Sequence, residues 1–224
     1  MKERNLGNEG QGENSSSQNV KIFILKIIRR GARGSKTEVF LSNGSSFFVT
    51  QGIVVKNQLE PGMVLEENQI QNLKNKANFI LAKKKSLEFL AVREYTVYQL
   101  KQKLLKKEFP SDIIENVLYE LQEEGSVSNE RFVELWIRSR LKKHPEGYRS
   151  LLYGLIKAGI PSGEAAKFLN LYIEDVDFEE VLKAAAEKIM RKNNITKEKL
   201  FRSLKGRGFD IASIIKFIEN HYDK

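Results

Sequence analysis

The chain of 224 residues contains an internal repeat in its C-terminal two thirds, and this repeat restricts the possible folds more than any other feature. Six apolar residues recur with identical spacing in three copies, whose first leucines lie 51 and 49 residues apart. Self-similarity at a period of this size is typical of stacked repeat proteins. The aligned sets are Leu100, Leu104, Phe109, Ile114, Val117 and Leu118; Leu151, Leu155, Ile160, Ala165, Phe168 and Leu169; and Leu200, Leu204, Phe209, Ile214, Phe217 and Ile218.

Each copy has the pattern of a helical hairpin. Its two leucines lie one helical turn apart, an apolar residue marks the following turn, and the last three positions have the i, i+3, i+4 spacing of a second helix. Thr96, Gly147 and Thr196 stand four residues before the first leucine of each copy, and all three are accepted N-cap residues. We therefore predict helix starts at these three positions.

A further helix is expected before each hairpin, over residues 73–92, 132–141 and 178–190. The last of these begins with Asp177 and Glu180 at capping-box spacing. The prediction is thus three tandem three-helix repeats, at 63–124, 125–175 and 176–224. Stacked helical units bury a continuous core and present a long surface to other macromolecules.

The N-terminal part has a different composition. Residues 1–19 carry almost no apolar side chains and are expected to form a disordered tail. Residues 20–62 contain three stretches rich in β-branched and aromatic residues, and Asn43-Gly44 between the last two is a strong hairpin signal. We expect a small N-terminal antiparallel β element before a mainly α body.

Several functional classes are disfavoured. The chain has no cysteine, so disulfides and thiolate metal sites are impossible and a reducing compartment is expected. No apolar stretch approaches the roughly 18 residues of a membrane span, and residues 1–19 lack the apolar segment of a secretory signal. The sequence predicts a cytoplasmic protein, largely monomeric, with no membrane partner.

Signatures of enzymes also fail. The segment 31–37 imitates a phosphate-binding loop, but Ser35 separates its glycine from Lys36, and a strand rather than a helix is expected after it. His144 and His221 have no second ligand at metal-binding spacing. Carboxylate pairs such as Glu123-Glu124 lie in polar surroundings that would not raise a pKa. We expect no enzyme activity, no cofactor and no metal.

Positive charge is the strongest functional signal in the composition. Lys and Arg number 38 against 29 Asp and Glu, a formal net charge of +9, and they cluster within residues 83–85, 101–107, 138–143 and 197–207. Such clusters favour an anionic partner, because they gain affinity by counterion release from phosphates. The plainer alternative for any single cluster is a solvated helix face. Trp136, one turn after Phe132, is expected to pack in the core rather than stack on a base.

The repeats resemble the RecX family of recombinase regulators over roughly residues 75–222. The first repeat has the pattern R-x-x-[ST]-x-x-x-L-x-x-K-L, and the second has an acidic-x-x-Phe start followed by G-x-x-x-[IL]. The sequence departs from the family at Asn129-Glu130, where two acidic residues are common, and at Ala158-Gly159-Ile160, where Lys-Gly-Ile is common. The matching residues of the first repeat are Arg93, Thr96, Leu100, Lys103 and Leu104.

The resemblance implies a non-enzymatic regulator that binds a RecA-type recombinase filament on single-stranded DNA. It implies inhibition of filament extension, ATP hydrolysis and strand exchange, and so a role in homologous recombination, DNA repair and the SOS response. Together with the charge pattern it suggests a set of filament- and DNA-binding residues. They are Lys83, Lys84, Lys85, Arg93, Lys103, Lys106, Lys107, Arg138, Arg140, Lys142, Lys143, Arg149, Lys205 and Arg207.

Two other functions fit the residues. A helix-turn-helix DNA-binding protein acting without the recombinase, on duplex DNA, would use one three-helix unit to read a groove. A scaffold that holds an acidic protein segment would need no nucleic acid. Binding by the first would fall steeply with salt on naked duplex, and binding by the second would survive nuclease treatment.

Overall fold

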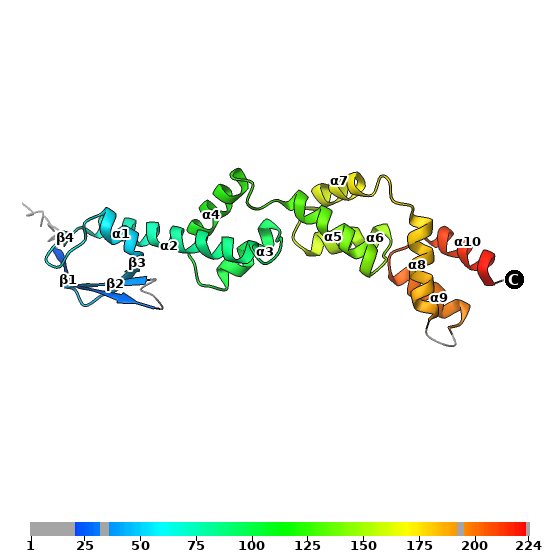
Figure 1. The fold of residues 1–224 in the computed structure, drawn as a ribbon, viewed down its shortest axis with the longest axis horizontal. Helices are drawn as coiled ribbons and strands as arrows, with labels where there is room; N and C mark the ends of the chain where they lie inside the picture. Colours follow the sequence, from blue (N-terminus) through cyan, green and yellow to red (C-terminus); the bar gives the residue numbers. More distant parts are fainter. Residues whose placement is uncertain (1–20, 32–35, 192–194, 223–224) are drawn as a thin grey trace, which may run out of the picture. The chain divides into compact units, whose positions relative to one another are not determined.

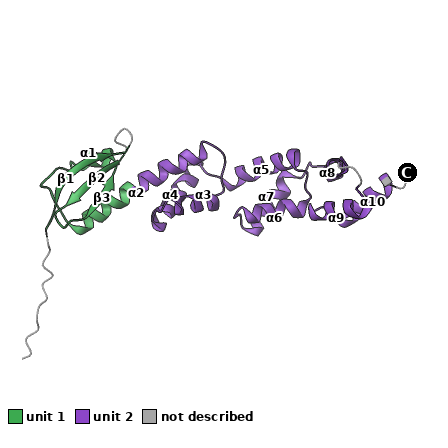
Figure 2. Ribbon diagram, turned by 90° about the horizontal axis from the view of Figure 1, so that it is seen from below, with its two compact units in different colours: residues 1–77 green, residues 78–224 purple. Residues whose placement is uncertain are grey.

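The computed structural model describes residues 21–31, 36–191 and 195–222, and Figure 1 labels its helices and strands. Two compact units divide the chain, Met1–Ala77 and Asn78–Lys224 (Figure 2). The expected disordered tail and most of the loop that imitates a phosphate-binding site fall outside the described residues. Across the described ranges, no helix combines the length and apolarity that a membrane crossing requires.

The first unit contains a four-stranded antiparallel sheet in the order β3-β2-β1-β4. The strands are β1 (Ile22–Arg30), β2 (Lys36–Leu41), β3 (Ser46–Val49) and β4 (Val64–Leu65). The predicted hairpin joins β2 to β3, with Gly44 at φ 83° and the Asn43 Oδ1 atom accepting a hydrogen bond from the Ser45 backbone N–H at 3.0 Å. Of the two turn residues, Gly44 takes the positive φ, which costs glycine no steric clash, and Asn43 contributes the side-chain hydrogen bond.

One face of the sheet packs against helices. Alternate residues of β1, β2 and β3 are buried with α1 (Gln51–Lys56) and the first part of α2 (Glu67–Leu90). Because successive side chains of a strand point to opposite faces, the other face of the sheet carries the residues between them. The buried set is Ile22, Ile24, Val39, Leu41, Phe47, Val49, Ile53, Leu59, Leu65, Ile70, Leu73 and Ala77.

Two elements of the first unit were not expected from the sequence. Helix α1 begins after its N-cap Thr50, whose side chain accepts a hydrogen bond from the Ile53 backbone N–H. Strand β4 is two residues long and pairs with Ile22 and Phe23 of β1. Elements this short lack the number of residues that a periodic pattern needs, so no sequence signal marks them. The unit also extends past residue 62, since Ile70 and Leu73 belong to its core.

The second unit contains the three predicted three-helix repeats. The first repeat consists of the C-terminal part of α2, α3 (Val97–Leu105) and α4 (Ser111–Glu123). The second consists of α5 (Asn129–Lys143), α6 (Tyr148–Lys157) and α7 (Ser162–Tyr172). The third consists of α8 (Phe178–Met190), α9 (Lys197–Gly206) and α10 (Ile211–Tyr222). Each repeat has its own cluster of buried residues. All six aligned apolar positions contribute to these clusters in every repeat, which confirms the alignment.

The helix starts agree with the sequence. Thr96 caps α3 by accepting from the Gln99 backbone N–H at 3.0 Å, and Thr196 caps α9 by accepting from the Lys199 backbone N–H at 3.4 Å. Gly147 is the N-cap of α6 without a side-chain bond. The predicted bounds are correct for α8, but α2 and α5 begin earlier than expected, at Glu67 and Asn129. The first turn of α5 is polar and carries no apolar signal, whereas in α2 the buried Ile70 stands three residues before Leu73 and continues the helical spacing toward the N-terminus.

Candidate functional site

Contacts between successive repeats fix the positions of the helices that carry the basic residues. At the first junction, the Thr96 hydroxyl donates a hydrogen bond of 2.7 Å to the Ala158 carbonyl oxygen in the turn between α6 and α7. Gly159 of the same turn has φ +90°, and a Cβ atom there would lie 2.2 Å from the Tyr98 ring. The start of α3 is therefore seated directly on the turn of the next repeat.

The second junction repeats this geometry. The Gly147 backbone N–H donates to the Arg207 carbonyl oxygen at 2.8 Å, in the turn between α9 and α10. A Cβ atom on Gly208, at φ +79°, would lie 2.3 Å from the Ser150 nitrogen. Arg149, two residues after Gly147, lines a pocket with Gly208 and Phe209 of this turn, which contains Arg207 and follows Lys205 at the end of α9. Three candidate residues from two repeats thus share one region.

A second group of candidates forms a cationic–aromatic cluster where α2 ends and α3 begins. The Arg93 guanidinium lies 3.9 Å from the centroid of the Tyr95 ring, and Lys85 Nζ lies 5.2 Å from that of Phe89. Lys103 Nζ lies 4.5 Å from the Phe89 centroid and 5.0 Å from the Tyr95 centroid. Burial raises the pKa of the Tyr95 hydroxyl, but Arg93 and Lys103 outweigh it and lower that pKa overall.

Lys103 is half-buried, although it lies outside the apolar stripe that Leu100 and Leu104 form on α3. Its ammonium group lies against the Phe89 ring of α2 and the Tyr95 ring of the segment before α3. Helical periodicity within α3 gives no information on a ring supplied by another helix.

Lys83 is occupied by two carboxylates. Its ammonium group donates to Glu120 and, at 2.7 Å, to Glu124, so it links α2 to α4. These hydrogen bonds, first to Glu120 and then to Glu124, raise the pKa of Lys83. Its neighbour Lys84 is exposed and forms no ion pair with any described residue, while Lys85 pairs with Glu88 at 2.7 Å. Of the three adjacent lysines, Lys84 is thus the most available to an anion.

The end of α3 carries two exposed cations. Lys106 is the C-cap of the helix and Lys107 follows it. Neither forms an ion pair within the described ranges. A plain structural role also exists for them, since cations near a helix C-terminus interact favourably with its dipole.

The last turns of α5 form the densest basic group. Arg138 pairs with Glu134 at 2.8 Å, whereas Arg140 pairs with Glu146 at 3.1 Å and lies 5.0 Å from the Trp136 ring centroid. Lys142 and Lys143 are exposed without an ion pair among the described residues. Trp136 packs in the core of its repeat, with its ring against Gly154, as expected.

One cation of this group was not identified from the sequence. Lys188 Nζ of α8 donates to the Lys143 carbonyl oxygen at 3.1 Å, which places a lysine of the third repeat at the end of α5. No spacing in the sequence connects these residues, because they come from different repeats and the contact is made to a backbone atom. Only an alignment of the repeats combined with the geometry of their junctions could have indicated it.

Eight of the candidate cations remain without an ion pair among the described residues. Lys84, Lys106, Lys107, Lys142, Lys143, Arg149, Lys205 and Arg207 are not ion-paired with described residues and belong to all three repeats of the second unit. No group of three His, Asp or Glu side chains able to hold a metal occurs in the part of the chain that the structure describes. Unpaired cations distributed over all three repeats are available to an anionic partner.

Comparison with known proteins identifies the family. A model of the first three-helix domain of RecX matches residues 82–121. The regulatory protein RecX of Clostridium acetobutylicum is 30% identical over 213 residues, which cover 88% of this chain and 98% of that protein. The regulatory protein RecX of Bacillus pumilus is 25% identical over 206 residues, 90% of this chain and 78% of that protein.

Solved structures agree in fold. A crystal structure of a regulatory protein RecX has a TM-score of 0.64 and 20% identity, and the match covers 89% of this chain and all of that one. The structure of RecX from Lactobacillus salivarius has a TM-score of 0.56 over 64% of this chain and 96% of that one, also at 20% identity. With three helical repeats of the predicted spacing and a full-length relative at 30% identity, this chain belongs to the RecX family of regulatory proteins.

Proposed function

We propose that this chain is a non-enzymatic regulator that binds a RecA-type recombinase filament on single-stranded DNA. Binding restrains filament extension, and it thereby lowers ATP hydrolysis and strand exchange. Membership of the RecX family carries the proposal. The unpaired cations of the three repeats support it, since single-stranded DNA presents phosphates at regular intervals.

The proposal assigns unequal roles to the basic residues. The anion-binding set is Lys84, Lys106, Lys107, Lys142, Lys143, Arg149, Lys205 and Arg207. Lys83 links α2 to α4 through two carboxylates, Lys103 of α3 lies against the Phe89 ring of α2, and Arg93 covers the Tyr95 ring, so removal of these three cations would act through the fold. Lys85, Arg138 and Arg140 each form an ion pair within the chain. Each must break this pair to bind a phosphate, which reduces its contribution to the free energy of binding.

The test is the single-stranded-DNA-dependent ATPase of the recombinase from the same organism, titrated with the full chain from far below to above stoichiometric amounts. Inhibition well below one regulator per recombinase supports action on the filament. Inhibition that begins only when the protein suffices to coat the DNA would point to simple competition for DNA and contradict the proposal, as would no effect at any ratio.

Charge reversal tests the residues. Lys142→Glu with Lys143→Glu should raise the concentration for half-inhibition by about tenfold or more, because two phosphate contacts become repulsive. The matched control is Lys157→Glu with Lys167→Glu, two exposed lysines of the same repeat on α6 and α7. It changes the net charge equally, so an equal loss in both variants would show a general charge effect and remove the site assignment.

A further inference from the structure

The outer face of the sheet in the first unit carries three phenylalanines that the core does not use. Phe23, Phe40 and Phe48 alternate with core residues on β1, β2 and β3, so all three lie on the face opposite the helices. Phe23 is 41% exposed and Phe48 is 47% exposed. A group of exposed aromatic rings on adjacent strands is typical of a binding surface, because contact of apolar area with water is unfavourable.

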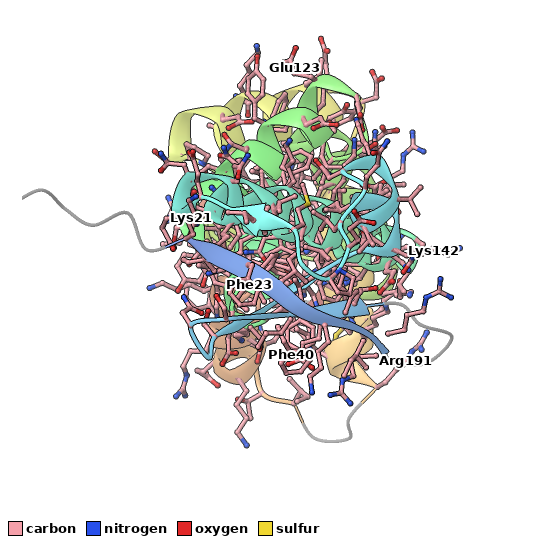
Figure 3. The ribbon with its side chains drawn as sticks, turned by 90° about the vertical axis from the view of Figure 1, so that its left-hand side faces the viewer. Lys21, Phe23, Phe40, Glu123, Lys142 and Arg191 are labelled. Carbon is pink, nitrogen blue, oxygen red and sulfur yellow. The ribbon has the colours of Figure 1, made fainter. Side chains whose placement is uncertain are left out.

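The rings lie on neighbouring strands. Figure 3 labels Phe23 on β1 and Phe40 on β2. Glu38 is opposite Phe48 and Phe40 is opposite Ser46, so Phe40 and Phe48 are diagonal neighbours across the β2–β3 ladder. Diagonal positions in an antiparallel pair are roughly 7–8 Å apart, which is close enough for consecutive unstacked bases to meet both rings.

Lysines accompany the rings. Lys26 Nζ lies 4.6 Å from the centroid of Phe40, and Lys36 Nζ lies 5.9 Å from the centroid of Phe48. Cations at ring faces are held by the ring quadrupole. When another planar group covers the ring, the flexible lysine can move aside and bind an anion next to it.

A β-bulge places Lys26 on this face. The register of β1 against β2 shifts between Ile24 and Lys26, so Ile24 is opposite Leu41 and Lys26 is opposite Phe40. In a regular strand Lys26 would follow Ile24 to the core side. Bulges commonly redirect a side chain beside a functional site, and here the redirected side chain is a cation over an aromatic ring.

The outer face of the sheet carries more positive than negative side chains among the described strand residues. Among the described strand residues the single carboxylate is Glu38, and it is already bound, since it accepts from Arg30 Nε at 3.0 Å and from the Ser46 hydroxyl at 3.0 Å. Lys26 and Lys36 form no ion pair with a described residue, and Lys21 at the start of β1 adds a third cation. The partner must therefore offer anions and flat apolar surfaces together.

We propose that this sheet face is a second binding site, one for single-stranded DNA, in which bases stack on Phe40, Phe48 and Phe23 while Lys26 and Lys36 bind the phosphates between them. Stacking on sheet aromatics is sequence-tolerant, because every base has a π face. Duplex does not fit, since its bases are already stacked on one another. The choice of DNA over RNA rests on the proposed function, which brings the chain to single-stranded DNA.

The site is tested with the full chain, an oligodeoxythymidylate containing 5-iodouracil, and no recombinase. Irradiation followed by trypsin should give DNA-bearing peptides 37–56, which hold Phe40 and Phe48, and 22–26, which hold Phe23. Cross-links confined to peptides of the helical repeats would overturn the proposal. Because the recombinase is absent, the result does not depend on whether the regulatory function is correct.

Affinity supplies a second readout. Phe40→Leu and Phe48→Leu keep an apolar side chain on the strand but remove the aromatic face, and each should weaken binding of oligodeoxythymidylate by roughly 5- to 100-fold. Val55→Ala is the matched control, an exposed apolar residue of α1 in the same unit. Thermal unfolding of each variant establishes that the sheet remains folded.

Charge variants and competitors complete the test. Lys26→Gln should weaken binding and reduce its salt dependence, whereas Lys56→Gln on α1 should not. Duplex DNA of equal length should compete poorly, and oligouridylate should compete less well than oligodeoxythymidylate. Equal competition by duplex would overturn the stacking geometry, and tighter binding of oligouridylate would overturn the assignment to DNA. Loss of recombinase inhibition by the Phe variants with unchanged DNA affinity would show a protein-docking face instead.

Discussion

Glycine is required at two of the three equivalent turns that follow the second helix of a repeat. Glu108, Gly159 and Gly208 all have positive φ, at 61°, 90° and 79°. Gly159 and Gly208 face the start of a helix from the preceding repeat, where a Cβ atom would lie 2.2–2.3 Å from its neighbours. Glu108 is exposed, so a side chain is tolerated there despite the unfavourable backbone conformation. Glycine is therefore required where the turn packs against the preceding repeat, and not by the backbone conformation of the turn alone.

Gly159→Ala should lower the free energy of unfolding by at least about 1–2 kcal/mol, because the left-handed conformation disfavours a Cβ atom and the methyl group would overlap the Tyr98 ring. Urea unfolding followed by circular dichroism measures the change. Gly163→Ala is the control, since nothing lies within 4 Å of its Cβ position, and it should be neutral or stabilise by about 0.4–1 kcal/mol. Equal effects of the two substitutions would refute the docking explanation.

Lys83 illustrates a cation whose role is structural. Its pKa is raised in the folded chain, mainly by Glu120 and Glu124, so its ion pairs stabilise the fold fully below the unfolded value of about 10.4. This contribution is lost as pH rises through the folded-state pKa.

Lys83→Met should therefore destabilise the chain at pH 8, and its difference from the unmodified protein should shrink as pH is raised beyond the unfolded value of about 10.4. Urea unfolding at pH 8 and at increasing alkaline pH gives these differences. Lys84→Met, at an exposed position without an ion pair among the described residues, should show no such pH dependence. A Lys83→Met difference that stays constant with pH would contradict the role of the two carboxylates.

At the level of the single element, helix starts serve two purposes. The Thr96 hydroxyl accepts from the Gln99 backbone N–H and donates to the Ala158 carbonyl oxygen of the next repeat, and Thr96 is fully buried. Thr196, at the same position of the third repeat, caps α9 but is exposed. Threonine at this position thus caps its helix in both repeats, but only Thr96 also forms a hydrogen bond to the next repeat.

The pair Thr96→Val and Thr196→Val separates these contributions. Both lose a cap worth about 0.5–2 kcal/mol. Thr96→Val should lose about 1–3 kcal/mol more, because it leaves the buried Ala158 carbonyl oxygen without its partner. Chemical denaturation compares the two directly, and an equal or smaller loss for Thr96→Val would show that the junction bond adds nothing.

Across the molecule, stability is distributed over separate cores. The second unit contains three clusters of buried residues, one per repeat, and the junctions add few residues to them. In arrays of this kind, stability is approximately the sum of repeat and interface contributions. A core defect in one repeat should therefore remain largely local.

Leu204→Ala tests this. The substitution removes a fully buried side chain of the third repeat and should cost about 2–5 kcal/mol. Native-state hydrogen exchange should show lost protection in α8, α9 and α10, while the amides of α3 and α4 remain protected. A uniform loss over the second unit would demonstrate one cooperative body.

Much of this architecture follows from the amino-acid sequence alone: the repeats, their buried residues, the caps at Thr96 and Thr196, and the hairpin at Asn43-Gly44. These features depend on spacing within one element or on a local turn, so the chain displays them in order. The charge pattern likewise indicates an anionic partner, because clusters of Lys and Arg are visible along the chain whatever its fold.

The availability of individual cations, in contrast, depends on tertiary contacts. Lys83 and Lys103 contact groups supplied by other helices, Lys188 reaches the second repeat, and a bulge turns Lys26 to the outer face of the sheet. The partners of these side chains are distant in sequence, and periodicity records only which face of an element is buried. Tertiary packing therefore decides which cations remain available, because it brings carboxylates and aromatic rings from other elements to some of them and leaves the rest exposed.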